Sequence, residues 1–288
     1  MSARLSRTIY GLVVLAVFAF VGCQQNSRGK QVIYEPLTDP NFVVPDYAME
    51  VIDATGGRTA WAKAKKLQLD CVLTVYTSDG GFYLTEQHHE ICPWLRLVRI
   101  VGTEPEGELT WQLSPEGFSA LKGVRRINAF PADVGAEDFA EAILIAMTIP
   151  ADLLDKNVGA PAAFIKGKQP IRIEGHWYYP IHRLAGSVGA FASEVIDSSK
   201  IVYYQSLDNS LVEVILLPRD EKTKPLVVRV YDYREAEKSN ILLPGKIEIF
   251  HGNPAYLKMH TASEGEPGAF LQERIFTIDY HSIKVSVY

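Results

Sequence analysis

The sequence predicts an α+β protein that is mainly β, built on an antiparallel sheet with helices against its apolar face. Two observations predict this class. Apolar and polar residues alternate through many short segments that are separated by Gly, Pro, Asn and Asp, as expected of strands joined by turns. One central segment changes to a helical period and is apolar over most of its circumference. A sheet with one apolar face needs a cover, and the helices are the candidates.

The first 22 residues have the composition of an export signal. Arg4 and Arg7 precede the apolar run 9–21, which is too short to span a bilayer comfortably, and Gly22 provides the small residue before Cys23. The following residues, 23–45, are polar and rich in proline and show no helical or strand period. We therefore expect a signal peptide over 1–22, a flexible tether over 23–45 and one folded domain over 46–288.

The segment Phe20-Val21-Gly22-Cys23 resembles the lipobox of bacterial lipoproteins. The resemblance implies cleavage before Cys23, a diacylglyceryl group on its thiol and a further acyl chain, such as palmitate, on its new amino group. Two or more acyl chains make membrane attachment stable. Gln24 in place of aspartate implies, by the same resemblance, sorting to the outer membrane, with the domain facing the periplasm. The alternative is an ordinary secretory signal in which Cys23 is incidental.

The charge balance excludes several partners. The chain of 288 residues has a net charge of −5, and removal of Arg4 and Arg7 with the signal makes it more acidic. Without a basic cluster it attracts neither nucleic acid nor anionic lipid headgroups by electrostatics. Attachment to the membrane is expected through Cys23 alone.

The domain begins with two short helices and a hairpin. Asp46 can cap a helix over 47–55 that ends at a Gly-Gly pair, and helix formers follow over 59–66. Strand residues 67–77 alternate strictly, and a turn at 78–81 returns the chain along 82–91. Further strands are expected at 94–102, 107–114 and 117–122, then at 171–184, 200–207, 211–217, 226–233, 246–251, 256–261 and 274–280, with the apolar helix between about 133 and 150.

Cys71 and Cys92 are the two cysteines of the domain. An exported chain meets an oxidising compartment, where such a pair can form a disulfide. In the hairpin, however, Cys71 lies opposite about His88, so pairing with Cys92 requires a bulge or an irregular strand end. The sequence leaves the disulfide open.

The order of several short motifs resembles the outer-membrane lipoprotein carrier superfamily. They are Ala54-Thr55-Gly56-Gly57, Pro93-Trp94-Leu95-Arg96, Trp111-Gln112-Leu113-Ser114, Asp232-Tyr233-Arg234 and Leu243-Pro244-Gly245-Lys246. The resemblance implies a strongly curved, incomplete barrel that wraps helices on its concave face and leaves an apolar cavity for acyl chains. The chain is longer than the carrier, and its extra segment 159–217 is either an extension of the sheet or a lid.

Seven apolar residues are candidates for the lining of such a cavity. An acyl chain that fills a gap gains about 25 cal/mol per Å² of apolar surface buried. If the helices fill the concavity completely, the same residues form only a core. The candidates are Leu69, Leu73, Val75, Leu95, Leu97, Ile143 and Met147.

Other polar residues have simpler interpretations. Glu86, His88 and Glu90 share a strand face and can hold a divalent ion, but further ligands are missing and an exposed polar face is favoured, so no metal site is predicted. The aromatic residues 177–179 can stack on a sugar ring, although packing is favoured. Arg99 shares a side with Leu95 and Leu97 in the expected strand and is a candidate to hold a lid.

The motifs of nucleophilic, phosphate-binding and zinc-peptidase sites are absent from the sequence. The hypothesis is a non-catalytic, lipid-anchored protein of the bacterial cell envelope, without a cofactor, that binds a lipid acyl chain or a lipidated partner. The alternative is a structural envelope lipoprotein with a filled core that interacts with another protein. A hydrolase with catalytic residues dispersed along the chain stays as a third class.

Overall fold

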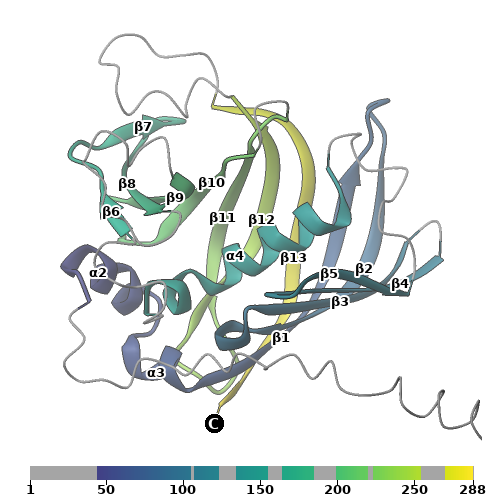
Figure 1. The fold of residues 1–288 in the computed structure, drawn as a ribbon, viewed down its shortest axis with the longest axis horizontal. Coiled ribbons are helices and arrows are strands. Elements are labelled where there is room, and N and C mark those ends of the chain that lie inside the picture. Colours follow the sequence, from purple (N-terminus) through teal and green to yellow (C-terminus); the bar gives the residue numbers. More distant parts are fainter. Residues whose placement is uncertain are drawn as a thin grey trace, which may run out of the picture. The chain divides into compact units, whose positions relative to one another are not determined.

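A computed structural model of the chain describes residues 44–104, 107–122, 134–154, 164–184, 199–219, 223–253 and 270–287. All of them belong to one unit of the chain, Tyr34–Tyr288. Their strands form one antiparallel sheet of thirteen strands that does not close into a barrel (Figure 1). The order is β5-β4-β3-β2-β1-β13-β12-β11-β10-β9-β8-β6, with β7 beside β8. The expected mainly-β, open half-barrel is confirmed. The predicted signal peptide, Cys23 and most of the tether lie outside the described residues.

The two wings of the sheet meet at the hairpin of β1 (Ala64–Tyr76) and β2 (Phe82–Cys92). The alternation seen in the sequence gives β1 one fully buried face, which includes Leu69, Leu73 and Val75. Asp79 shapes the turn, because its carboxylate accepts hydrogen bonds from the Thr77 hydroxyl and the Gly81 amide. The turn therefore sets the register that directs this apolar face inward.

One wing of the sheet follows from β2. The predicted third strand begins later than expected, because Pro93 starts a single 3-10 turn, η1 (Pro93–Leu95), and Arg96 adopts a left-handed conformation with φ 47°. The wing then runs through β3 (Leu97–Glu104), β4 (Gly107–Ser114) and β5 (Gly117–Lys122). The proline and the positive φ together turn the chain, so that it enters β3 from the concave side of the hairpin.

The other wing begins with the long C-terminal strand β13 (Leu271–Val287), which pairs with β1 and joins the two ends of the domain. The predicted strand 171–184 is divided by a turn at Glu174 and Gly175, both with positive φ. The predicted strand 256–261 lies outside the described residues. The remaining strands of this wing are β12 (Leu242–Gly252), β11 (Leu226–Glu235), β10 (Val212–Leu217), β9 (Ser199–Ser206), β8 (His176–Leu184), β7 (Ile171–Ile173) and β6 (Phe164–Lys166).

The described part of the extra segment 159–217 extends the sheet. Strands β6 to β10 all lie within it, and each pairs antiparallel with a neighbour. Alternate residues of these strands enter two different clusters: Ile201 and Tyr203 join the main core, whereas Val202 and Tyr204 join a second, smaller core. Around these residues of β9 the sheet is therefore buried on both faces.

Three described helices cover the concave face: α2 (Asp46–Ala54), α3 (Arg58–Lys63) and α4 (Ala136–Leu154). Helix α4 contacts β3 and β4 of one wing and β10, β11 and β12 of the other, so it lies along the hollow of the sheet (Figure 1). Its burial on nearly all sides agrees with its apolar circumference.

Helix α4 continues past the predicted end at residue 150. Pro150 has no amide hydrogen for the helix, and Thr148 leaves the helical conformation at φ −122° and ψ 16°. The Thr148 hydroxyl donates to the carbonyl of Leu144 at 2.7 Å. The helix therefore kinks instead of ending, and the turn beyond the kink carries Asp152 to the edge of the concavity.

Candidate functional site

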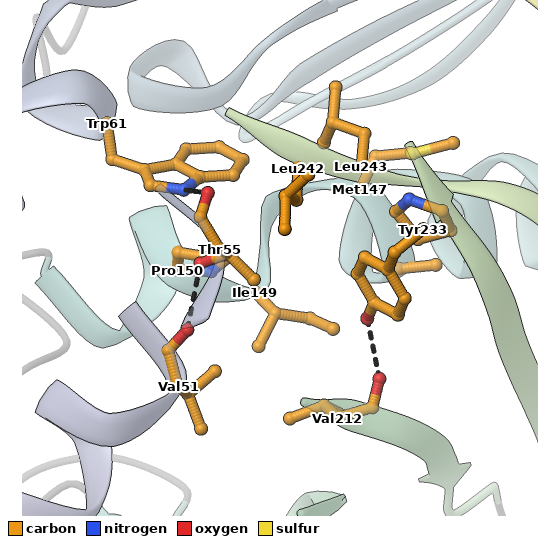
Figure 2. Close-up of a pocket in the computed structure, with 12 residues that line it drawn as sticks. Val51, Thr55, Trp61, Met147, Ile149, Pro150, Val212, Tyr233, Leu242 and Leu243 are labelled. Carbon is orange, nitrogen blue, oxygen red and sulfur yellow. Dashed lines mark hydrogen bonds between the residues drawn. The ribbon is translucent and has the colours of Figure 1, made fainter. Parts of the chain in front are cut away.

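An apolar pocket lies between α4, the α2–α3 turn and the strands β10 to β12 (Figure 2). Figure 2 shows Trp61 and Thr55 on one side of it and Tyr233 and Val212 on the other, with Leu242 and Ile149 between them. The lining consists of Val51, Thr55, Trp61, Ala146, Met147, Ile149, Pro150, Val212, Tyr233, Leu242, Leu243 and Pro244.

The polar atoms of the lining have partners within the protein. The indole nitrogen of Trp61 donates to the Thr55 carbonyl at 3.1 Å, and the Thr55 hydroxyl donates to the Val51 carbonyl at 2.8 Å (Figure 2). The Tyr233 hydroxyl donates to the Val212 carbonyl at 2.6 Å. Burial raises the pKa of Tyr233, so this phenol stays protonated at neutral pH. The side chains of Thr55, Trp61 and Tyr233 are therefore all paired, and the surface that the lining presents to the pocket is apolar.

The pocket is nearly filled. Its free volume is about 10 Å³ on a scale where one water molecule needs about 10–15 Å³. An acyl chain cannot enter a space of this size unless α4 or the short helices move. The structure is therefore a closed form of any binding cavity, or a packed core.

Five of the seven residues expected to line the cavity, Leu69, Leu73, Val75, Ile143 and Met147, are fully buried in the main core. Met147 is the one among them that also lines the pocket.

Leu95 and Leu97 are half-buried and stand apart from that core. On β3 the inward residues are Val98 and Ile100, since the turn at Arg96 shifts the alternation. The sequence analysis did not include the lining residues from α2, α3 and β12. The features of the sequence that indicate them are the Gly56-Gly57 break and Pro244.

A buried ionic cluster holds the end of α4. Asp152 is 2% exposed and forms ion pairs with Arg96, which follows η1, and with Arg183 of β8, at 3.3 Å for the second pair. The Tyr203 hydroxyl of β9 donates to the same carboxylate at 2.9 Å. Since Arg96 belongs to one wing and Arg183 and Tyr203 to the other, Asp152 connects both wings through α4. We call these four residues the Asp152 cluster.

The expectation that Arg99 holds a lid is not supported by its position. Its side chain is 45% exposed on the outer face, where the guanidinium lies 3.8 Å from Glu90. Arg96 contacts the helix instead, because the left-handed conformation of its backbone takes its side chain off the alternation of the strand.

A second polar group is buried beneath the N-terminal half of α4. The His89 ring lies edge-on to Phe139, and its nitrogens lie 3.0 Å from the Tyr280 hydroxyl and 3.0 Å from the Gln87 side-chain oxygen. Burial lowers the pKa of His89 to about 3. Burial raises the pKa of the Cys71 thiol, which lies 3.7 Å from the ring. A neutral thiol beside a neutral imidazole is a poor nucleophile, so this pair is structural.

The two cysteines are free. Cys71 belongs to the fully buried inner face of β1, whereas Cys92 follows the inward Ile91 on β2 and is half-buried. Successive strand residues point to opposite faces, so the two thiols lie on opposite sides of the sheet. This arrangement explains why the hairpin does not join them.

The outer row of β2 is an exposed ionic surface. His88 lies 2.6 Å from Asp70, and Glu90 lies 2.9 Å from Lys66. Within the described residues no group of three or more His, Cys, Asp or Glu side chains is arranged to hold a metal ion. The row therefore serves as a solvated face of the sheet.

Comparison with known proteins gives distant structural likenesses. No protein-family model matches the sequence, and no curated protein shows significant similarity to it. A LolA superfamily protein from Nitrosomonas europaea superposes with a TM-score of 0.46 and 10% identity, over 85% of this chain and 94% of that one. A DUF1329 family protein from Desulfovibrio piger superposes with a TM-score of 0.39 and 9% identity, over 84% of this chain and 93% of that one.

An outer membrane lipoprotein-sorting protein domain from Vibrio parahaemolyticus superposes with a TM-score of 0.38 and 8% identity, over 83% of this chain and 91% of that one. Separately, none of the described helices has the length and apolar character needed to cross a membrane.

Proposed function

We propose that this is a lipid-anchored protein of the bacterial cell envelope that binds an apolar ligand, a lipid acyl chain or a lipidated partner, between its sheet and α4. The observation that carries the proposal is the pocket itself: an apolar lining whose inner wall is a single kinked helix. In this proposal the protein performs no covalent chemistry. His89 and Cys71, whose pKa values are shifted by burial, are both fully buried and both uncharged.

Binding requires α4 to move, and the kink provides a place for that movement. Beyond Thr148 the last turn lacks the amide hydrogen of Pro150, so it is less firmly connected to the rest of the helix. Each methylene of an entering acyl chain contributes about 0.8 kcal/mol. The burial of a long acyl chain can therefore offset the free energy that is lost when a few core contacts separate and the Asp152 cluster loosens.

The anchor belongs to the same proposal. Acyl chains on Cys23 hold the protein at the membrane, and residues 23–45 connect them to α2, next to the pocket. The domain then faces the periplasm, with the outer membrane favoured. Metabolic labelling with a palmitate analogue tests this anchor: labelled wild type and unlabelled Cys23→Ser support it, and equal labelling of the two contradicts it.

Uptake of a fluorescent fatty acid by the delipidated full chain tests the pocket. We expect saturable uptake and, by mass spectrometry, lipid bound to the protein as purified. Ala146→Met fills the pocket from α4 and is expected to weaken uptake about tenfold, whereas the exposed Leu84→Met on β2 leaves it unchanged. Absence of both bound lipid and saturable uptake contradicts the proposal.

The small volume of the pocket favours a second candidate, a structural envelope lipoprotein whose filled core supports a protein-binding outer face. Affinity purification from solubilised membranes separates the two. A stoichiometric protein partner without bound lipid supports the structural role, and bound lipid without such a partner supports the first.

A further inference from the structure

The concave face of the second wing carries a polar and aromatic surface apart from the apolar pocket. Tyr179 of β8 lies directly opposite Gln205 of β9 in the register of the two strands. Trp177, two residues before Tyr179, shares its face, and the carbonyl of Trp177 accepts a hydrogen bond from the Leu207 amide at 3.2 Å. Lys166 of β6 places its ammonium group 4.3 Å from the centre of the Tyr179 ring.

Gln205 is the central residue of this surface. It is 2% exposed, and its side-chain nitrogen donates to the Glu50 carboxylate of α2 at 3.0 Å. This bond fixes which end of the amide is the oxygen, because a carboxylate accepts only from the nitrogen. The oxygen is buried and has no hydrogen-bond partner among the described residues. A buried acceptor without a donor is energetically unfavourable, so the site favours a ligand that supplies one.

The groups around this oxygen have complementary hydrogen-bonding roles. Glu50 is 53% exposed and accepts only, whereas Lys166 is 28% exposed, donates only and lies 4.0 Å from Glu50. Trp177 is 50% exposed and Leu207 is 46% exposed, so a flat apolar surface borders the polar atoms. Acceptors, a donor and an exposed aromatic ring within one small area fit a ring that carries hydroxyl groups on its edge and C–H groups on its faces.

We propose that Trp177, Tyr179, Gln205, Glu50 and Lys166 form a binding site for a saccharide or a similar polyhydroxylated ring. The ring stacks on Trp177, one hydroxyl donates to the Gln205 oxygen, and neighbouring hydroxyls bond Glu50 and Lys166. The half-exposed side chain of Glu50 rotates to admit the ligand to the amide. The site involves Glu50 of α2, whereas the pocket is lined by Val51 and Thr55, so the two share no residue and the site does not depend on the binding of an apolar ligand.

Tryptophan fluorescence tests the site directly. The chain has four tryptophans, and Trp61, Trp94 and Trp111 are at most 2% exposed, so acrylamide quenches mainly Trp177. The probes are the methyl glycosides of glucose, galactose and mannose and myo-inositol, added to the full chain up to roughly 100 mM because single-ring ligands bind weakly. We expect at least one probe to protect Trp177 saturably; protection by none of them overturns the proposal.

Two variants and a matched control distinguish specific binding at this site from nonspecific binding elsewhere on the surface. Gln205→Met keeps the length of the side chain without the acceptor, and Trp177→Ala removes the stacking surface; we expect each to weaken binding at least fivefold, measured for both by saturation-transfer NMR of the active probe. Phe82→Ala removes an aromatic ring that is 65% exposed, more than that of Trp177, from β2 and should leave binding unchanged. Undiminished binding to folded Trp177→Ala overturns the proposal.

A comparison of methyl glucoside with octyl glucoside below its micelle concentration identifies the source of the sugar. Tighter binding of the octyl compound, lost in Trp177→Ala, assigns the site to a lipid headgroup, and equal binding assigns it to a free saccharide. Failure of fatty-acid uptake, by contrast, would contradict the proposed function and leave this result untouched.

Discussion

Asp152 shows how a single buried charge can determine the position of a helix. Its carboxylate lies between two arginines from opposite wings, and the protein must keep all three charges paired because desolvation of an unpaired one is costly. No pattern in the sequence indicates that Arg96 rather than Arg99 contacts this carboxylate. The partners are far apart in the chain, and the deciding feature is one residue with positive φ.

Asp152→Asn keeps the shape of the side chain and removes its charge. We expect the free energy of unfolding to fall by about 3–5 kcal/mol, because Arg96 and Arg183 lose the anion that neutralises them. Urea denaturation measures the change. The matched control is Asp279→Asn on the outer face, 55% exposed and 3.5 Å from Lys246, which should cost about 1 kcal/mol or less. Equal losses in the two variants would contradict the role given to the cluster.

His89 makes the stability of the domain depend on pH. Its pKa is about 3 in the folded protein and 6.5 when exposed, so between these values the unfolded chain binds one more proton. Stability should therefore fall as the pH decreases below 6.5, by about 1.4 kcal/mol for each pH unit. His89→Gln removes this contribution. Denaturation from pH 7 to pH 4.5 should show a steeper loss in wild type than in the variant, and parallel curves would refute the assignment.

At the scale of elements, the turn between α2 and α3 is set by a close contact with the β11–β12 connection. A Cβ on Gly56, whose φ is 115°, would lie 2.2 Å from the Asn240 carbonyl oxygen. The neighbouring Gly57 also has positive φ, 86°, but a Cβ there meets nothing within 4 Å. Substitutions at the two glycines therefore distinguish the effect of the steric contact, present only at Gly56, from that of backbone strain, present at both.

Gly56→Ala and Gly57→Ala form a matched pair for this contact. The Gly57 variant should cost about 1–2 kcal/mol from backbone strain alone. The Gly56 variant should lose about 2 kcal/mol more, because the turn must also move away from Asn240 in the β11–β12 connection. Thermal unfolding of both variants checks the difference, and a Gly57 variant that loses as much as the Gly56 variant would rule out the contact.

The elements differ in how far the sequence reveals them. Strict alternation identified β1 and β2 closely, since one face of that hairpin is fully buried. The end of α4 was placed too early, because Pro150 is tolerated at a kink that only the tertiary contacts stabilise. The predicted strand 171–184 missed a turn at Glu174-Gly175, where a single glycine is the only local signal.

At the scale of the whole domain, the pairing of β1 with β13 unites the two wings into one sheet around α4. The class of fold was predictable from alternation and from motif order, whereas the closeness of the packing was not. Whether a concavity is filled depends on fractions of a side-chain volume at Met147 and Tyr233, and no pattern in the sequence contains that information. Of the seven residues predicted to line a cavity, Met147 is the one that lines this pocket.

Hydrogen–deuterium exchange of the delipidated full chain, with and without dodecanoate, tests the central claim most directly. The account predicts that the ligand changes the protection of amides in α4 beyond Ala146 and in the α2–α3 turn, while β1 and β13 stay unchanged. An identical exchange pattern in both states, or a change confined to the outer face of the sheet, would contradict the claim that α4 moves to admit an apolar ligand.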